Sequence, residues 1–198
     1  MKKITILNGS LGGQNGNTAA VLKLLVSELA PFSEINSIHL SETDLTQKKA
    51  LEKLLSESDA FVFATGTYWD SWGSPMQRFF EEATEFETGP VWLGKSAATL
   101  VTMHSVGGKA ILSRLQGVLS TLGLLIPPMS GMVYSLAGHL ALQSHATEFH
   151  SDIWQLSDLK VIAENLLTAV NLSLQNGEET TWRTWPTDTQ DPHRPWFS

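Results

Sequence analysis

The sequence predicts a three-layer α/β sandwich around a five-stranded parallel sheet. Short apolar runs alternate with segments whose apolar residues recur at helical spacing, which is typical of βαβ units with right-handed crossovers. The 198 residues suit a single domain of ordinary size. Hydrophobic residues make up 42% of the chain and charged residues 17%, against ~25% in an average domain, so the chain can bury a sizeable core.

The first half of the chain supplies three of the five strands and two helices. The strands are short apolar or β-rich runs, of which the second is the weakest: 4–7, 35–40 and 61–64. The helices are indicated by apolar residues at helical spacing. They cover about residues 18–30, with Val21, Leu22, Leu25 and Leu29 on one face, and a segment marked by Leu51, Leu54 and Leu55.

The second half begins with a helix and a buried strand. Ser74 is expected to be the N-cap of this helix, with Pro75 at its first position and Gln77 completing a capping box. Residues 97–103 form an apolar run typical of a buried strand. The next helix is indicated by Ile111, Leu115, Val118, Leu119 and Leu122. A last helix is expected over about residues 158–174.

The fifth strand is interrupted in the sequence. Two apolar runs, 124–126 and 132–134, share its position and are separated by Pro127-Pro128. Because proline cannot donate to a ladder, this strand is expected at the edge of the sheet or broken there. Two strand orders fit the alternation, the Rossmann order and the flavodoxin-like order 2-1-3-4-5. In both, a ligand binds outside the carboxyl ends of the strands, where the strand order reverses.

Two segments depart from the regular pattern. Residues 136–157 form a connection longer than the usual limit of ~12–15 residues, which indicates a functional segment or part of an interface. Residues 177–198 carry three prolines and several tryptophans, so we divide the chain into a domain over 1–176 and an irregular aromatic tail over 177–198. Because disordered tails are poor in aromatics, this tail is expected to dock on its own domain or on a partner subunit.

The loop after the first strand is rich in glycines, hydroxyls and amides and ends at a helix N-terminus. Its glycines fall at positions 9, 12, 13 and 16, which fits neither G-x-G-x-x-G nor a Walker A loop. The free N–H groups and the dipole of the helix favour an anion there. Four polar residues supply further donors for a phosphate monoester: Ser10, Asn15, Asn17 and Thr18. The alternative is a plain turn with an Asn or Thr helix cap.

The loops after the third and fourth strands supply flat and polar groups. Tyr68, Trp69 and Trp72 fall within five positions, and their faces suit either a planar heteroaromatic ring or a neighbouring subunit. Paired glycines before the next helix let backbone N–H groups approach a ligand closely. His104 either donates to a ring carbonyl or is a structural histidine with its own partner.

Composition excludes several classes of function. Acidic residues number 20 and basic residues 13, and the net charge of −7 argues against a nucleic-acid binder. The chain has no cysteine, which excludes disulfides, thiol nucleophiles and zinc–thiolate sites. His139, His145 and His150 are irregularly spaced and no HExxH motif occurs, so no metal site is expected. With no membrane-length apolar run and no secretory leader, we expect a cytoplasmic protein without membrane partners.

Three motifs resemble one known family. They are GSLGGQNGNT after the first strand, TGTYWDSWGSPMQRFFEEAT after the third, and TMHSVGGKAILSRLQGVLSTLG from the end of the fourth. In order and spacing they resemble the flavodoxin-like NADPH-dependent FMN reductases and quinone reductases, over roughly residues 3–135. Two positions depart from the family pattern: many members carry arginine where this chain has Gly12, and proline where it has Gly66.

The resemblance implies the flavodoxin-like strand order 2-1-3-4-5 and a bound FMN. It implies that the FMN phosphate is held by Ser10, Asn15, Gly16, Asn17 and Thr18. It also implies that the ribityl chain and ring are lined by Thr67, Tyr68 and Trp69, and that the ring is edged by His104, Ser105, Gly107 and Gly108. Because the flavin carries the redox chemistry, no side chain is assigned as catalytic.

Two functions from different classes follow. In the first, the protein is an enzyme that passes a hydride from NAD(P)H through bound FMN to a small acceptor such as a quinone or a flavin. In the second, it is a flavodoxin-type electron carrier that docks a protein partner through an acidic rim, without NAD(P)H turnover. Residues 136–157 suggest a homodimer or homotetramer that walls the site, which favours the enzyme. A flavin-binding regulatory module is a third possibility.

Overall fold

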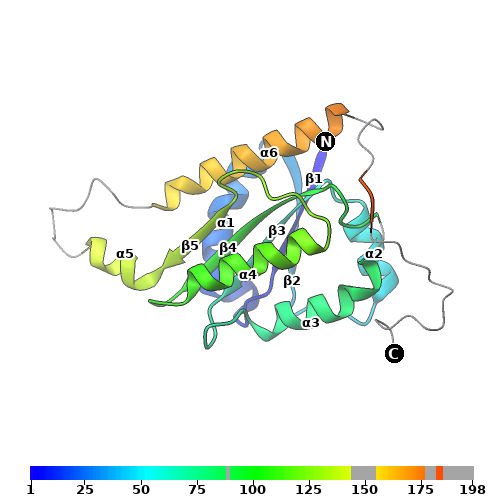
Figure 1. Cartoon of the computed structure of the whole chain (residues 1–198). Coiled ribbons are helices and arrows are strands. Elements are labelled where there is room, and N and C mark those ends of the chain that lie inside the picture. Colours follow the sequence, from blue (N-terminus) through cyan, green and yellow to red (C-terminus); the bar gives the residue numbers. More distant parts are fainter. Residues whose placement is uncertain (88–89, 144–154, 177–181, 185–198) are drawn as a thin grey trace.

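A computed structural model describes residues 1–87, 90–143, 155–176 and 182–184 (Figure 1). Its centre is a parallel sheet with the strand order β2-β1-β3-β4-β5. The flavodoxin-like order is therefore confirmed and the Rossmann order is excluded. The strands are β1 (Lys2–Asn8), β2 (Ser33–His39), β3 (Ala60–Gly66), β4 (Ser96–Met103) and β5 (Gly131–Ser135).

Helices cover both faces of this sheet (Figure 1). Helices α1 (Asn17–Leu29) and α6 (Leu159–Asn176) pack together on one face. The other face carries α2 (Lys48–Ser56), α3 (Ser74–Ala83) and α4 (Gly108–Thr121). Helix α5 (Leu136–Gln143) follows β5 directly and extends beyond the carboxyl ends of the strands. Short 3₁₀ turns cover Gly13–Asn15, Thr84–Phe86 and Leu156–Asp158.

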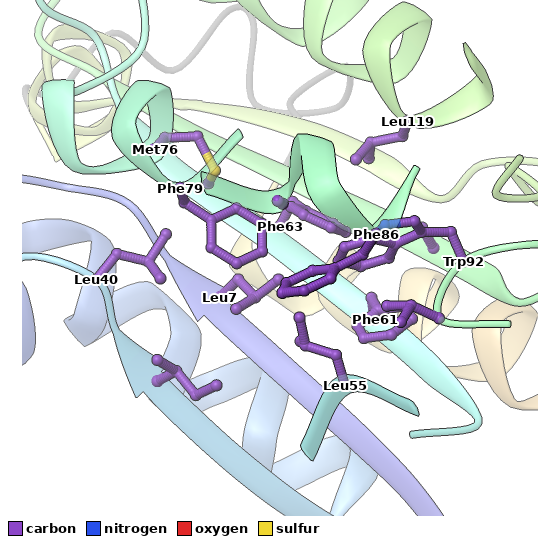
Figure 2. Close-up of a cluster of buried hydrophobic side chains, with 14 of the residues drawn as sticks. Leu7, Leu40, Leu55, Phe61, Phe63, Met76, Phe79, Phe86, Trp92 and Leu119 are labelled. Carbon is purple, nitrogen blue, oxygen red and sulfur yellow. The ribbon is translucent and has the colours of Figure 1, made fainter. Parts of the chain in front are cut away.

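Side-chain alternation along the strands divides the core into two halves. Phe61 and Phe63 of β3 face α2, α3 and α4, whereas Val62 and Ala64 face α1 and α6. The first half is aromatic, and Figure 2 shows its rings gathered together: Phe61, Phe63, Phe79, Phe86 and Trp92. Burying one such side chain stabilises the fold by about 1.5–3 kcal/mol. The strand ends therefore project their loops from a rigid base.

The expected start of α3 is wrong in its details. The N-cap residue is Gly73, Ser74 is the first helical residue, and no side chain caps the helix. With Gly73 as the N-cap, Gln77 is the fourth helical residue, one position beyond that of a capping box, and its side chain has other partners. It accepts a hydrogen bond from Trp72 Nε1 at 3.0 Å and donates to Glu81 at 2.9 Å. The sequence pattern did not reveal these contacts.

The fifth strand also differs from the expectation. Leu125 forms an isolated bridge with Ser96, and the strand itself is Gly131–Ser135 at the edge of the sheet. The edge position expected from the two prolines is confirmed. Both proline carbonyls are satisfied in the turn, because Ser130 Oγ donates to Pro127 O at 2.6 Å and Asn165 Nδ2 donates to Pro128 O at 2.8 Å.

Candidate functional site

A cavity of about 560 Å³ opens at the carboxyl ends of β1, β3 and β4, where the strand order reverses. Its volume lies within the ~300–1,000 Å³ usual for ligand pockets. Among the described residues, those that line it include two histidines but no lysine, arginine, aspartate or glutamate. They are Ser10, Gly12, Gly16, Asn17, Thr18, Ala20, Val21, Leu24, Gly66, Thr67, Tyr68, Thr102, Met103, His104, Tyr134, Leu136, His139 and Leu156.

One end of the cavity is the N-terminus of α1. Gly16 is the N-cap residue and no side chain caps the helix, so the Asn or Thr cap of the alternative interpretation is not formed. The N–H groups of the first turn have no carbonyl partner within the helix, and the helix dipole is positive there. A Cβ on Gly12 would lie 2.8 Å from Gly16 Cα, so this loop requires glycine to turn so tightly. Backbone donors and the Asn17 side chain are therefore available to an anion at this end.

Two buried hydroxyl groups tie the same end of the cavity to the sheet. Ser10 Oγ donates to Asn8 Oδ1 at 2.8 Å, and Asn8 is the last residue of β1. Thr18 Oγ1 lies 2.7 Å from Thr102 Oγ1 of β4. These contacts fix the loop after β1 and the first turn of α1 against strand ends that are themselves rigid.

A two-residue hairpin turn follows β3. Tyr68 and Ser71 exchange backbone hydrogen bonds of 2.8 and 2.9 Å, and both residues between them have positive φ, at 48° for Trp69 and 57° for Asp70. Tyr68 lines the cavity, and its hydroxyl accepts a hydrogen bond from Leu11 N at 3.1 Å. Trp69 is fully exposed at the tip of the turn. The hairpin therefore offers Tyr68 to the cavity and Trp69 to its surroundings.

Arg114 of α4 clamps this hairpin from the side. Its Nη2 atom donates to Asp70 O at 2.9 Å and to Ser71 Oγ at 3.3 Å. Its guanidinium also lies over the Trp72 ring, 5.1 Å from the centroid. Such cation–π contacts contribute about 0.5–1 kcal/mol at exposed sites.

The loop after β4 brings His104 to the cavity, while its glycines serve packing. Gly107 is the N-cap of α4 with a φ of 86°, and a Cβ there would meet Asp70 Oδ1 at 2.4 Å. A Cβ on Gly108 would meet Val133 Cγ1 at 2.3 Å. Gly107 thus lets this loop approach the 68–71 hairpin, and Gly108 lets α4 approach β5.

The structure brings together seven of the twelve residues expected to bind the cofactor. Those that line the cavity are Ser10, Gly16, Asn17, Thr18, Thr67, Tyr68 and His104. Those outside its lining are Asn15, Trp69, Ser105, Gly107 and Gly108. Both groups were predicted from the same motifs, but the conformation of each loop decides which of these residues line the cavity.

The far rim of the cavity is formed by residues that the motifs did not single out. Tyr134 ends in a hydroxyl 2.5 Å from His139 Nδ1, and Gln143 Nε2 lies 2.9 Å from His139 Nε2. Both nitrogens of the His139 ring are therefore held, one by the Tyr134 hydroxyl and one by the Gln143 amide. Burial raises the pKa of Tyr134. The unusual length of segment 136–157 was the signal that pointed to this rim, which also includes Leu136 and Leu156.

The described part of the tail lies at the opposite end of the sheet. A Cβ on Gly94, whose φ is 77°, would meet Trp182 Cδ1 at 2.5 Å, so the indole lies directly against that turn. Residues 177–181 and 185–198 fall outside the described residues. In the described ranges, no helix is long and apolar enough to cross a membrane, and no cluster of ligand side chains that could hold a metal ion occurs.

The strand order, and a cavity that begins at the first helix, define a flavodoxin-like α/β protein. The model of the NADPH-dependent FMN reductase family matches residues 2–138. The chain belongs to this family, so the resemblance seen in the motifs is confirmed. Membership supports FMN as the cofactor and oxidoreduction as the class of activity. Among curated proteins, none matches the sequence.

Solved structures with the same fold are distant in sequence. An oxidoreductase from Corynebacterium diphtheriae has 16% identity and a TM-score of 0.67, over 87% of this chain and 98% of that one. FerB, a flavoenzyme NAD(P)H:acceptor oxidoreductase from Paracoccus denitrificans, has 20% identity and a TM-score of 0.62, over 88% and 98%. RosB with bound 8-demethyl-8-formylriboflavin-5′-phosphate has 15% identity and a TM-score of 0.63, over 97% and 93%. At these identities the likeness shows the fold alone.

Proposed function

We propose that the protein is an FMN-dependent enzyme that passes a hydride from NAD(P)H through the flavin to a small acceptor such as a quinone or another flavin. The observation that carries the proposal is the cavity at the carboxyl edge of the sheet, within a chain that belongs to the FMN reductase family. It joins an anion site at one end to aromatic and polar groups at the other. That sequence of environments suits a flat ring with a phosphate tail.

The residues present fit FMN without a cationic side chain. The phosphate would lie at the start of α1, held by backbone N–H groups with Ser10, Asn17 and Thr18 around it. The absence of acidic residues among the described lining residues removes repulsion from a dianion. The ribityl chain and ring would extend past Thr67 and Tyr68 toward His104.

When bound, FMN would supply the hydride chemistry, and the chain would orient it and exclude water. Val21, Leu24 and Leu136 give the cavity apolar walls. The Tyr134 hydroxyl, held 2.5 Å from His139 Nδ1, would hydrogen-bond a carbonyl or ring nitrogen of the acceptor. A donor held at the rim would orient the acceptor rather than bind the flavin phosphate.

The proposed enzyme is a homodimer or homotetramer. Large apolar side chains are exposed on segments that border the cavity, with Trp69 101%, Val106 71% and Leu140 53% accessible. Contiguous exposed apolar surface marks contact sites, and we propose that these three side chains contribute to one. Light scattering on the purified protein tests this, and a monomer at micromolar concentration would contradict it.

Anaerobic absorbance spectroscopy tests the proposed reaction. The purified protein should show flavin bands, and heating should release FMN. NADH or NADPH should bleach these bands in a single two-electron phase, and a small quinone should restore them. Steady-state rates should then follow ping-pong kinetics. An FMN-loaded protein that ignores both nicotinamides, yet forms a stable semiquinone with dithionite, would support the electron carrier instead.

A further inference from the structure

Asn8 is a buried amide at the last position of β1, directly before the loop that begins the cavity. Its side chain is 1% exposed and takes part in four hydrogen bonds. Oδ1 accepts from Ser10 N at 3.1 Å and from Ser10 Oγ at 2.8 Å. Nδ2 lies 3.0 Å from Gly13 O and 3.1 Å from His39 Nδ1. One side chain thus holds the loop after β1 at two points, Ser10 and Gly13.

The hydrogens of this amide determine the state of His39. Gly13 O is a carbonyl and takes one of the two Nδ2 hydrogens, so the second points at His39 Nδ1. That nitrogen therefore carries no hydrogen, and the imidazole is neutral with its proton on Nε2. A doubly protonated His39 would place N–H against N–H. Flipping the Asn8 amide would remove this clash only by placing Nδ2 against the Ser10 N–H and Oδ1 against Gly13 O.

We propose that Asn8 is the positioning residue of the FMN phosphate loop and that neutral His39 holds its amide in the working orientation. The inference rests on the proposed function, because it takes this loop as the site of the FMN phosphate. Protonation of His39 breaks the bond to Asn8 or turns its amide, and Ser10 then loses its partner. The loop consequently binds FMN less tightly at acid pH.

The charged groups around His39 come from the loop that follows β2. Glu42 and Asp44 line a hollow to which His39 also contributes. The α2 residues described there carry no charge: Ala50, Leu51 and Leu54. Glu42 Oε1 accepts a hydrogen bond from Gln14 N at 2.9 Å, so Glu42 also holds the loop after β1. His39 O is held by Thr43 Oγ1 at 2.8 Å. The backbone that carries the imidazole is therefore fixed.

FMN affinity measured by fluorescence quenching between pH 8 and pH 5 tests the proposal. The FMN phosphate itself gains a proton in this range, and that loss of affinity is common to every variant. His39→Gln removes the imidazole and retains an acceptor oxygen, so its loss of FMN affinity should come only from protonation of the phosphate. The wild-type protein should lose about tenfold more affinity than His39→Gln over the range, as expected when a buried donor loses its partner.

A second variant tests the Asn8 amide itself. Asn8→Asp removes both Nδ2 donors and adds a carboxylate, so FMN affinity at pH 8 should fall at least tenfold. Because a protonated His39 can donate to that carboxylate, the extra loss at acid pH should disappear in this variant. Riboflavin, which lacks the phosphate, should bind all three proteins with one pH profile. Circular dichroism melting curves establish that each variant is folded.

The outcomes separate the two proposals. If the wild-type protein binds no FMN at any pH, the proposed function is wrong and this inference falls with it. If FMN binds but wild type and His39→Gln lose affinity equally toward pH 5, the role of His39 is wrong. If Asn8→Asp, with a native melting curve, binds FMN as tightly as wild type at pH 8, Asn8 does not position the loop.

Discussion

The two ends of the cavity are built in different ways. The end at α1 is made of one continuous stretch of chain, and its polar groups are fixed by hydrogen bonds to strand ends. The rim at the other end combines residues of three separate elements: Tyr134 of β5, His139 of α5 and Leu156 of the 3₁₀ turn before α6. The family match ends at residue 138, so part of this rim lies beyond it.

This difference indicates which property of the protein a substitution at each end of the cavity should change. A phosphate needs only a tight turn and a free helix N-terminus, so the α1 end is specified locally. The rim depends on the junction between β5 and α5, because Tyr134 belongs to β5 and His139 to α5. Changes at the first end should therefore alter cofactor affinity, whereas changes at the rim should alter the choice and rate of substrates.

The largest expected effect is at the α1 end. Asn17→Asp places a negative charge beside the proposed phosphate position, where charge-assisted hydrogen bonds contribute about 1.5–3 kcal/mol each. FMN affinity, measured by calorimetry, should fall by roughly tenfold to a hundredfold. Riboflavin affinity should change little.

Asn15→Asp is the matched control for this prediction. Asn15 is an exposed amide two residues earlier and lies outside the cavity lining. The same charge there should weaken FMN binding only slightly, because water screens it. Equal losses in the two variants would show that the long-range charge, and not the lining position of Asn17, is what matters.

Much of the α1 end could be predicted from the sequence, and little of the rim could. The glycines, hydroxyls and amides of residues 9–18 sit next to a helical pattern, so local chemistry alone indicated an anion site. His139 has no local pattern that predicts a contact with Tyr134 five residues earlier. The motifs also gave no sign that Gly107 and Gly108 need to lack a Cβ for contacts between loops and between α4 and β5. Such uses depend on tertiary packing, which spacing along the chain does not encode.

The next largest effect is on the pH dependence of folding stability. It arises at the opposite end of the sheet and should not change the cavity. Lys95 Nζ donates to Leu55 O and Ser56 O at 3.2 and 2.9 Å, and lies 5.7 Å from the Phe61 ring centroid. Burial lowers the pKa of Lys95 from 10.5 to about 8. Between these values the unfolded chain holds a proton that the folded protein has released, so stability rises with pH.

Urea unfolding at pH 8 and pH 10 measures this term. The free energy of unfolding of the wild type should increase by about 1–2 kcal/mol relative to Lys95→Met, a figure reduced because the amine is partly open to water. FMN affinity should be the same in both proteins at each pH. A parallel pH dependence of stability in wild type and variant would contradict the shift at Lys95.

A smaller effect is expected at the rim. Tyr134→Phe removes the hydroxyl that is hydrogen-bonded to His139 and leaves the ring in place. One hydrogen bond of about 1 kcal/mol corresponds to a fivefold to tenfold change, which should appear in kcat/KM for the quinone. FMN affinity should stay within about twofold of wild type. A larger loss of FMN affinity than of kcat/KM would place the hydroxyl at the cofactor and remove the distinction between the two ends.

The smallest effect concerns the hairpin tip, where stability and function are expected to oppose each other. Both central residues of this two-residue turn have positive φ, a geometry that favours Asn-Gly, and here they are Trp69 and Asp70. Replacing the pair with Asn-Gly should relieve about 1 kcal/mol of backbone strain and raise Tm by a few degrees. FMN affinity should not change, because Trp69 lies outside the cavity lining.

If the exposed indole contacts the nicotinamide, as its position beside the cavity predicts, KM for NAD(P)H should rise severalfold in the same variant. A lower Tm would show instead that the indole is covered in the native assembly, and an unchanged KM would remove Trp69 from the substrate side of the site.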